Sequence, residues 1–317
     1  MKSIRLFSMA MLCMAMVLVS CSGEDGEQGL QGKEGPQGPQ GEQGDQGEQG
    51  EPGKDNPAKD FYFQNGYKGY EGTQDAQISD VGGSTNNGIL NIIDDVDNPG
   101  DERLSLIRFD GIADKVNNEY GSDNTSCGDK YSVNQAILYL YCTQTLGNLA
   151  PGYIHLGFYG PQDPLFDEES VTWSMANATD PWFIPGARSE LFEGPFPGTD
   201  NYTAGMGLIG DSSSNIGWIA VHLPRDVVMR WICDESERNK GIRLRLSTDA
   251  DGGTTTMRFM SSESDKPDLR PLLVIQTEEL DADTSAKSAM NNTKPKDWES
   301  LTYEERMAPL YEFLSKK

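Results

Sequence analysis

Histidine and basic residues are scarce in this chain of 317 residues, and their scarcity excludes several classes of function. There are two histidines, and Lys and Arg together number 26 against 50 Asp and Glu, so the formal net charge is −24. Nucleic-acid binding needs a basic surface that displaces counterions, and the charge argues against it. Attachment to an anionic membrane through charge is disfavoured for a similar reason. We therefore expect no nucleic-acid partner and a self-repelling, soluble surface.

The sequence also lacks the local motifs of common catalytic sites. It contains no nucleophile elbow, no zinc-protease helix motif and no phosphate-binding loop. No cysteine spacing resembles that of a zinc site. Two carboxylates for glycoside hydrolysis can come from any two places in a sequence, and this acidic chain singles out no pair. We predict a non-catalytic protein, with a polysaccharide hydrolase or lyase as the third alternative.

Long apolar runs are missing except at residues 6–19. This run of about 14 residues follows Lys2 and Arg5 and is too short for a membrane-spanning helix, so it is typical of a signal peptide. The LVSC sequence that ends at Cys21 resembles the lipobox of bacterial lipoproteins, in which cleavage occurs before a lipid-bearing cysteine. Several acyl chains on one cysteine anchor a protein stably. We expect residues 1–20 to be removed, and lipid on Cys21 to hold the protein on the outer membrane or cell surface.

Cysteine itself is rare, with only Cys13, Cys21, Cys127, Cys142 and Cys233 in the chain. Cys13 lies in the signal segment and Cys21 is the predicted lipid site, which leaves an odd number in the mature body. An oxidising compartment then permits one disulfide and one free thiol. We expect Cys142, which ends a predicted strand, to be one partner, and either Cys127 or Cys233 to be the other.

Residues 23–53 carry glycine at every third position without a break. This is the period of collagen, in which only glycine fits the crowded axis of three chains. An extended helix of this length would reach roughly 95 Å. Proline is scarce and the charge is one-sided, so a disordered spacer is the alternative. In both cases residues 21–59 form a lipid-anchored stalk, and a triple helix would make the protein a homotrimer.

The period of the apolar residues changes to two after the stalk. Residues 135–142, 153–159, 218–223, 241–246 and 272–276 alternate or are rich in aromatic and β-branched residues. Short alternating runs separated by polar turns predict an antiparallel β-sandwich, here over residues 60–277. The spacing of Val227 and Trp231 predicts one short helix at 226–231. Trp173 and Trp231 are expected in the core, and Arg108–Asp110 and Arg270–Glu263 as structural ion pairs.

Six segments resemble, in order and spacing, the DNRLRE-type domain, a family similar to carbohydrate-binding modules. They are residues 103–110 (RLSLIRFD), 135–141 (QAILYLY), 169–173 (ESVTW), 217–231 with Gly241, 259–263 (FMSSE) and 270–275 (RPLLVI). The resemblance covers roughly residues 72–277. It implies an all-β fold, a jelly-roll antiparallel β-sandwich. It also implies glycan binding, because some members of the family bind algal polysaccharides.

Candidate ligand-binding residues lie on the strand faces opposite the aliphatic ones. Tyr153 and His155 alternate with Ile154 and Leu156, and Trp218 and His222 occupy the equivalent face of residues 218–223. If these strands share a sheet, the face presents aromatic rings and hydrogen-bonding groups that suit a sugar. The alternative is that a loop or the C-terminal segment covers it. Trp182 and Arg188 in the loop 180–196 are further candidates, and self-packing of that loop is the alternative.

Two acidic segments are candidate calcium ligands. Asp94, Asp95 and Asp97 precede the first family-like strand, and Asp249 and Asp251 form a second acidic turn. Hard oxygen ligands in flexible loops suit Ca²⁺. Neither segment has a full EF-hand pattern, and solvated acidic turns are the alternative. We therefore predict a structural calcium ion, and no other cofactor.

The C-terminal segment 278–317 reads as a linker followed by an amphipathic helix. Thr302 and Glu305 form a capping-box pattern. Tyr303, Met307, Leu310, Tyr311 and Leu314 follow at helical spacing, and Pro309 is expected to kink the helix. Such a short helix is marginal alone, so it should dock on its own domain or on a partner.

Together these patterns predict a surface lipoprotein whose β-sandwich binds an extracellular polysaccharide or a cell-surface glycan. The rival hypothesis is a structural or protein–protein adhesion module that the stalk trimerises.

Overall fold

The computed structural model describes residues 58–81, 89–95, 102–123, 126–146, 152–159, 162–188, 202–204, 217–248, 254–280 and 298–317. The chain divides into two units, Met1–Gly53 and Lys54–Lys317. All described elements belong to the second unit. The predicted signal peptide, the lipid site Cys21 and the Gly-X-Y repeat lie outside the described residues.

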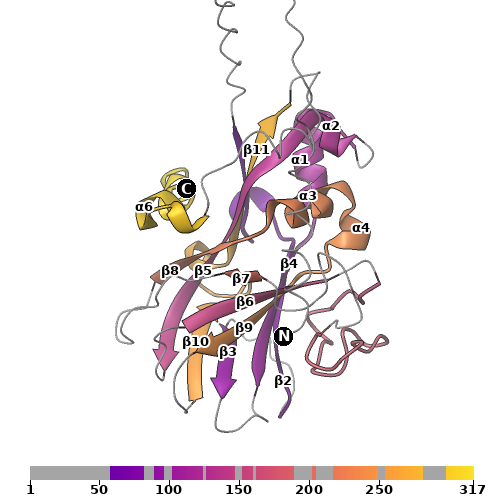
Figure 1. The fold of residues 1–317 in the computed structure, drawn as a ribbon, viewed down its shortest axis with the longest axis vertical. Helices are drawn as coiled ribbons and strands as arrows, with labels where there is room; N and C mark the ends of the chain where they lie inside the picture. Colours follow the sequence, from indigo (N-terminus) through magenta and orange to yellow (C-terminus); the bar gives the residue numbers. More distant parts are fainter. Residues whose placement is uncertain are drawn as a thin grey trace, which may run out of the picture. The chain divides into compact units, whose positions relative to one another are not determined.

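Antiparallel strands make up most of the body (Figure 1). They are β1 (Lys59–Phe63), β2 (Thr73–Ser79), β3 (Ile89–Asp95), β4 (Arg103–Phe109), β5 (Tyr131–Leu146), β6 (Gly152–Phe158), β7 (Tyr202–Ala204), β8 (Gly217–His222), β9 (Ile242–Thr248), β10 (Thr254–Met260) and β11 (Leu272–Glu279). The hydrogen-bonded order is β1-β11-β5-β10-β3-β4-β9-β6-β7, with β8 paired to β5 and β2 to β4. All the strands predicted from the sequence are therefore present.

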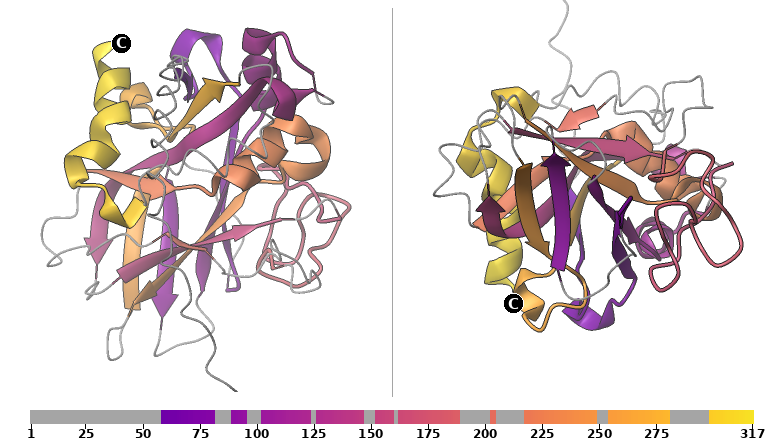
Figure 2. Two further views of the ribbon diagram at one scale, coloured as in Figure 1. Left: turned by 45° about the horizontal axis from the view of Figure 1, so that its top comes forward. Right: turned by 90° about the horizontal axis from the view of Figure 1, so that it is seen from below.

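The strand path folds into two facing layers (Figure 2). Strands β1, β11, β5 and β8 form one layer, and β2, β4, β9, β6 and β7 form the other, while β10 and β3 connect them. Val221 of β8 and Leu138 of β5 share a buried apolar cluster with Leu156 of β6 and Leu244 of β9, although these two strand pairs do not hydrogen-bond to each other. The predicted alternation is confirmed, because the aliphatic faces of β6, β8 and β9 all point into this core.

Helices close one end of the layers (Figure 1). They are α1 (Ile112–Tyr120), α2 (Cys127–Lys130), α3 (Arg225–Cys233) and α4 (Glu235–Arg238), with short 3-10 turns η1 (Tyr67–Gly69), η2 (Pro267–Leu269) and η3 (Trp298–Ser300). The predicted helix is α3, with Val227 and Trp231 buried. No pattern in the sequence predicts α1, whose first N–H groups donate to the Glu235 carboxylate. Within the described part, no helix is long and apolar enough to span a membrane.

The C-terminal helix α6 (Tyr303–Ser315) docks on its own domain. Met307, Leu310 and Phe313 pack with Tyr139 and Val274 on the outer face of β5 and β11. The capping box of Thr302 and Glu305 is confirmed. The helix continues past Pro309, which is buried on the docked face, where packing offsets the missing donor, and the kink expected there stays a prediction. Tyr303 and Tyr311 are exposed rather than on that face.

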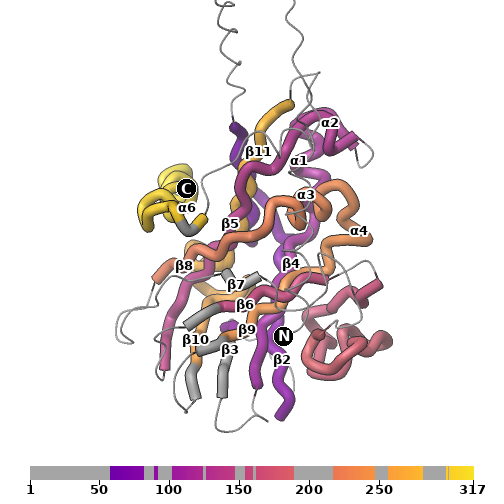
Figure 3. The backbone as a smooth tube through the Cα atoms, in the orientation of Figure 1, coloured from indigo at the N-terminus to yellow at the C-terminus, as the bar shows by residue number. Residues whose placement is uncertain are grey.

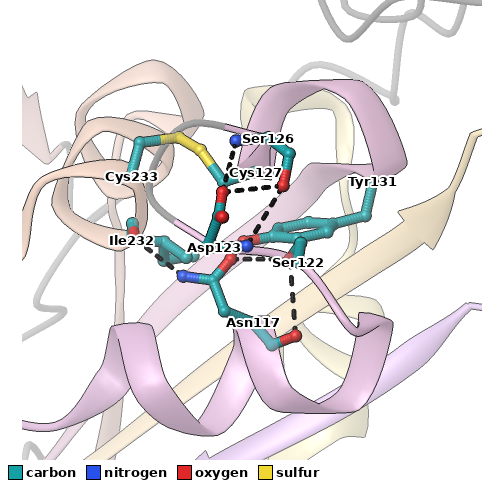
Figure 4. Close-up of a disulfide and its surroundings, with 8 residues drawn as sticks. All are labelled: Asn117, Ser122, Asp123, Ser126, Cys127, Tyr131, Ile232 and Cys233. Carbon is teal, nitrogen blue, oxygen red and sulfur yellow. Dashed lines mark hydrogen bonds between the residues drawn. A yellow bond between two sulfur atoms is a disulfide. The ribbon is translucent and has the colours of Figure 1, made fainter.

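A disulfide joins Cys127 of α2 to Cys233 of α3, with 5.6 Å between the Cα atoms (Figure 4). The expectation that Cys142 would be a partner is wrong. Strand alternation directs Cys142 into the core beside Leu138 and Leu140, away from both other cysteines. Burial raises the pKa of the Cys142 thiol to about 11, so it stays protonated and unreactive at neutral pH. Beside the disulfide, Asn117 of α1 donates to the Ile232 carbonyl and accepts from the Tyr131 hydroxyl.

We predict that the double variant Cys127→Ser/Cys233→Ser unfolds more easily than the wild type. The bond closes a long loop between residues 106 positions apart, and its loss should lower the free energy of unfolding by about 2–5 kcal/mol. Urea unfolding of both proteins measures the difference. Thiol titration of the denatured mature protein should detect Cys142 alone, and reactive Cys127 and Cys233 would contradict the assignment.

We predict that Leu310→Ala loosens α6. Leu310 is fully buried against the sheet, and truncation should cost about 2–5 kcal/mol of unfolding free energy. The matched control is Tyr311→Ala on the exposed side of the same helix, with an expected change of about 0.5 kcal/mol or less. Equal losses in the two variants would show that α6 does not dock as described.

Candidate functional site

The structure separates the four residues predicted to form a sugar-binding face. Trp218 and His222 lie on β8, which pairs with β5, whereas Tyr153 and His155 lie on β6, which pairs with β9 and β7. These strands belong to opposite layers, and their outer faces point in opposite directions. A single surface made of all four residues is therefore excluded. The prediction went wrong because alternation within a strand does not reveal which strands are neighbours.

The C-terminal segment covers the β8 half of that predicted surface. The His222 ring stacks on Trp298 at 5.1 Å between centroids, and Trp218 packs edge-on against Tyr141 at 5.4 Å. Trp218 also belongs to the apolar cluster that receives α6. On the other layer, His155 is half-buried and lies opposite Arg245, while Tyr153 lies opposite Ser247 and its side chain is outside the described residues. The covering that the sequence allowed as an alternative is thus present over β8.

Residues 162–188 form a self-packed loop over β2 and β4 (Figure 3). Trp182 is buried, stacks on Tyr159 at 5.8 Å and donates its indole N–H to the Thr172 carbonyl. Its ring is therefore not available to a sugar. Arg188 forms an ion pair with Glu102 at 3.1 Å. Trp173 packs on the same cluster, as predicted, and would collide with a side chain at Gly186, which has a φ of 84°.

The predicted calcium ligands lie largely outside the described residues. Asp97, Asp249 and Asp251 are not described, and for Asp94 and Asp95 only the backbone is. The register places Asp95 of β3 opposite Thr254 of β10, so the strands that flank the two acidic segments meet at one end of the body. Among the side chains that are described, no group of three or more His, Cys, Asp or Glu could hold a metal ion. A calcium site on these segments stays a prediction.

An open depression of about 420 Å³ lies where the loop meets the outer face of β2 and β4. Gln74 and Arg108, which are cross-strand neighbours, form one side. The loop segments 165–167 and 177–180 form the other. Leu165 adds an exposed apolar surface beside these polar groups. The depression therefore combines hydrogen-bonding side chains with a small apolar area.

Asn177 organises the loop side of the depression. Its amide donates to the Leu165 carbonyl and to Asp180 Oδ2, at 3.0 and 2.9 Å. Its oxygen accepts from the Thr179 and Asp180 backbone N–H groups. Because Asn177 is fully occupied, it shapes the wall and leaves other groups to meet a ligand.

Arg108 is fixed from both sides. Its guanidinium donates to both carboxylate oxygens of Asp110, at 2.6 and 3.0 Å, and to the Phe166 carbonyl at 2.5 Å. The Arg108–Asp110 ion pair predicted from the sequence is confirmed. The Arg270–Glu263 pair is wrong: Arg270 instead donates to the backbone carbonyls of Ser264 and Asn65. Since Asp110 neutralises Arg108, the depression keeps the negative potential of Asp167 and Asp180.

Three polar groups at the depression have no hydrogen bond within the part of the chain that is described: the Gln74 amide, Asp167 Oδ2 and Asp180 Oδ1. Two of them are pure acceptors, and the amide both donates and accepts. Sequence reasoning missed this site. Gln74 and Asp180 stand in no motif, and only the fold brings residues so far apart in the chain together.

No protein-family model matches the chain, and no curated protein matches it. The chemistry of the site therefore rests on its own residues.

Proposed function

We propose that this protein is a lipid-anchored surface protein whose β-sandwich binds an extracellular glycan, without catalysis, in the depression between β2, β4 and the loop 162–188. The proposal includes the jelly-roll fold of the DNRLRE-type domain and anchoring through Cys21. The observation that carries it is the group of polar side chains at Gln74, Asp167 and Asp180, whose amide and carboxylate oxygens surround the exposed Leu165. Sugar hydroxyls donate to carboxylates and amides, and the C–H face of a sugar ring packs on apolar surface.

The charge of the depression favours a neutral glycan. Asp167 and Asp180 contribute negative charge, and the positive charge of Arg108 is taken by Asp110. An acidic polysaccharide would meet like charge on a protein with a net charge of −24. A neutral, hydroxyl-rich chain brings donors without that repulsion.

The disulfide supports export of the chain. Disulfides persist in oxidising compartments and are rare in the cytosol. The Cys127–Cys233 bond therefore agrees with a signal peptide that is removed before Cys21.

A glycan array tests this proposal, with the mature chain made soluble by Cys21→Ser. We expect neutral glycans to bind. The double variant Gln74→Ala/Asp180→Asn should raise the dissociation constant about tenfold or more, since each lost hydrogen bond is worth about 1 kcal/mol. Added salt should change the affinity little. Tyr303→Ala, exposed on α6 over the other layer, is the control and should bind normally. Absence of binding, or a preference for acidic glycans, would sink the proposal.

A second candidate function is an adhesion module that the stalk trimerises. The unbroken glycine period of residues 23–53 favours it. Analytical ultracentrifugation should show a trimer for the mature chain that is lost when residues 23–53 are deleted. A monomer in both cases would leave the stalk as a spacer and remove this candidate.

A further inference from the structure

Three carboxylates from separate segments meet at the edge of β2. Asp75 belongs to β2, Glu168 to the loop 162–188, and Glu263 to the turn that follows β10. Glu168 Oε2 accepts the Asp75 backbone N–H at 3.1 Å, on the side of β2 that carries no strand partner among the described residues. The Asp75 side chain is fully buried.

The two oxygens of the Asp75 carboxyl differ in their surroundings. Oδ2 accepts the Ser262 backbone N–H at 2.7 Å, whereas Oδ1 is buried without a hydrogen-bond partner in the described part of the chain. The Glu263 carboxyl is a neighbour that raises the pKa of Asp75, and it accepts from the hydroxyls of Ser261 and Ser262, the residue whose backbone N–H donates to Asp75. Glu263 is itself exposed, whereas Asp75 is buried, so both burial and the neighbouring carboxyl disfavour a charge on Asp75.

No basic side chain relieves this effect within the described residues. None of the ion pairs among the described residues includes Asp75, Glu168 or Glu263. Arg108 faces Glu168 and lowers its pKa, but Asp110 already holds that guanidinium, and Glu169 adds a further negative charge. Burial first, and then the charge of Glu263, raise the pKa of Asp75 well above its usual range, against the opposing effect of the Ser262 N–H.

We propose that Asp75 carries a proton in the folded protein and donates it to the Glu263 carboxyl, so that this hydrogen bond ties β2 to the turn after β10. The proton occupies Asp75 Oδ1, the oxygen of this carboxyl that has no hydrogen-bond partner in the described part of the chain.

The proton on Asp75 makes the stability of the fold depend on pH. The folded pKa of Asp75 lies above its unfolded value, so the folded state binds more protons than the unfolded state between the two. The stabilisation is complete below the unfolded pKa and is lost as pH rises through the folded pKa. Burial also raises the pKa of Glu168 and of Glu235. A variant at Asp75 is therefore needed to isolate its contribution to the pH dependence of stability.

Urea unfolding of wild type and Asp75→Asn, from about pH 8 to about pH 4, tests this inference. The amide of Asn donates to Glu263 as the protonated acid does, and carries no charge to bury. We expect its urea midpoint to match or exceed that of the wild type at neutral pH, and the gap to narrow on acidification. If the urea midpoint of Asp75→Asn is lower than that of the wild type at neutral pH, and does not reach it at any pH tested, Asp75 acts as an anion and the proposal is overturned.

The control is Asp268→Asn, the same change at an exposed aspartate. Lys317 lowers the pKa of Asp268, so this variant should show the opposite trend, with any loss growing as pH rises. Similar pH trends for the two variants would contradict the assignment to Asp75.

A direct measurement on the wild type keeps the test independent of folding of the variants. Carboxyl carbon shifts of labelled aspartate and glutamate, followed by NMR against pH, should reveal one carboxyl that stays protonated near neutral pH and disappears in Asp75→Asn. If calcium instead raises the urea midpoint of the wild type and not of Asp75→Asn, the trio holds a cation in place of the proton and the proposal fails.

Discussion

The packing of β5 and β8 against β6 and β9 is the contact on which the rest of the molecule depends. Leu138, Val221, Leu156 and Leu244 meet in one cluster, although their strands are joined only through the long route by β10 and β3. Burial of that apolar surface holds together segments that are far apart in the chain. Once the inner faces are committed to each other, strand alternation fixes which residues point outward from each layer.

The two outer faces are then covered in different ways. On one layer, α6 and Trp298 seal the aromatic face of β5, β8 and β11, where the Tyr139 hydroxyl donates to the Arg306 carbonyl at 2.7 Å. On the other, the loop 162–188 covers Ala76 and Leu106 with Trp182 and Phe166. The loop seals the apolar middle of β2 and β4 and contacts Arg108 through Phe166, but it leaves Gln74 partly exposed. The candidate site exists because this cover is incomplete at its polar end.

Much of the fold could be read from local patterns, and little of the site could. The alternation at 154–158 and 242–246, the spacing of Val227 and Trp231, and the pair Thr302–Glu305 each depend on residues close together in sequence, and all three predicted the right element. The disulfide, the separation of Trp218 from His155, and the exposure of Tyr311 depend on which elements are neighbours. Which elements are neighbours depends on strand register and on the order of the layers, and neither can be predicted from a single sequence.

Charge explains why the edge of β2 looks as it does. An edge strand with unpaired N–H groups invites pairing with another chain, and acidic side chains are one means of preventing it. Here Glu168 accepts the Asp75 N–H directly, so the carboxylate both occupies the edge and attaches the loop to it. This arrangement places a buried aspartate beside a second carboxyl. An acidic chain has few cationic side chains to balance their negative charge. A proton is the smallest counter-charge that fits such a place, and it links the closing of this edge to the acidity of the surroundings.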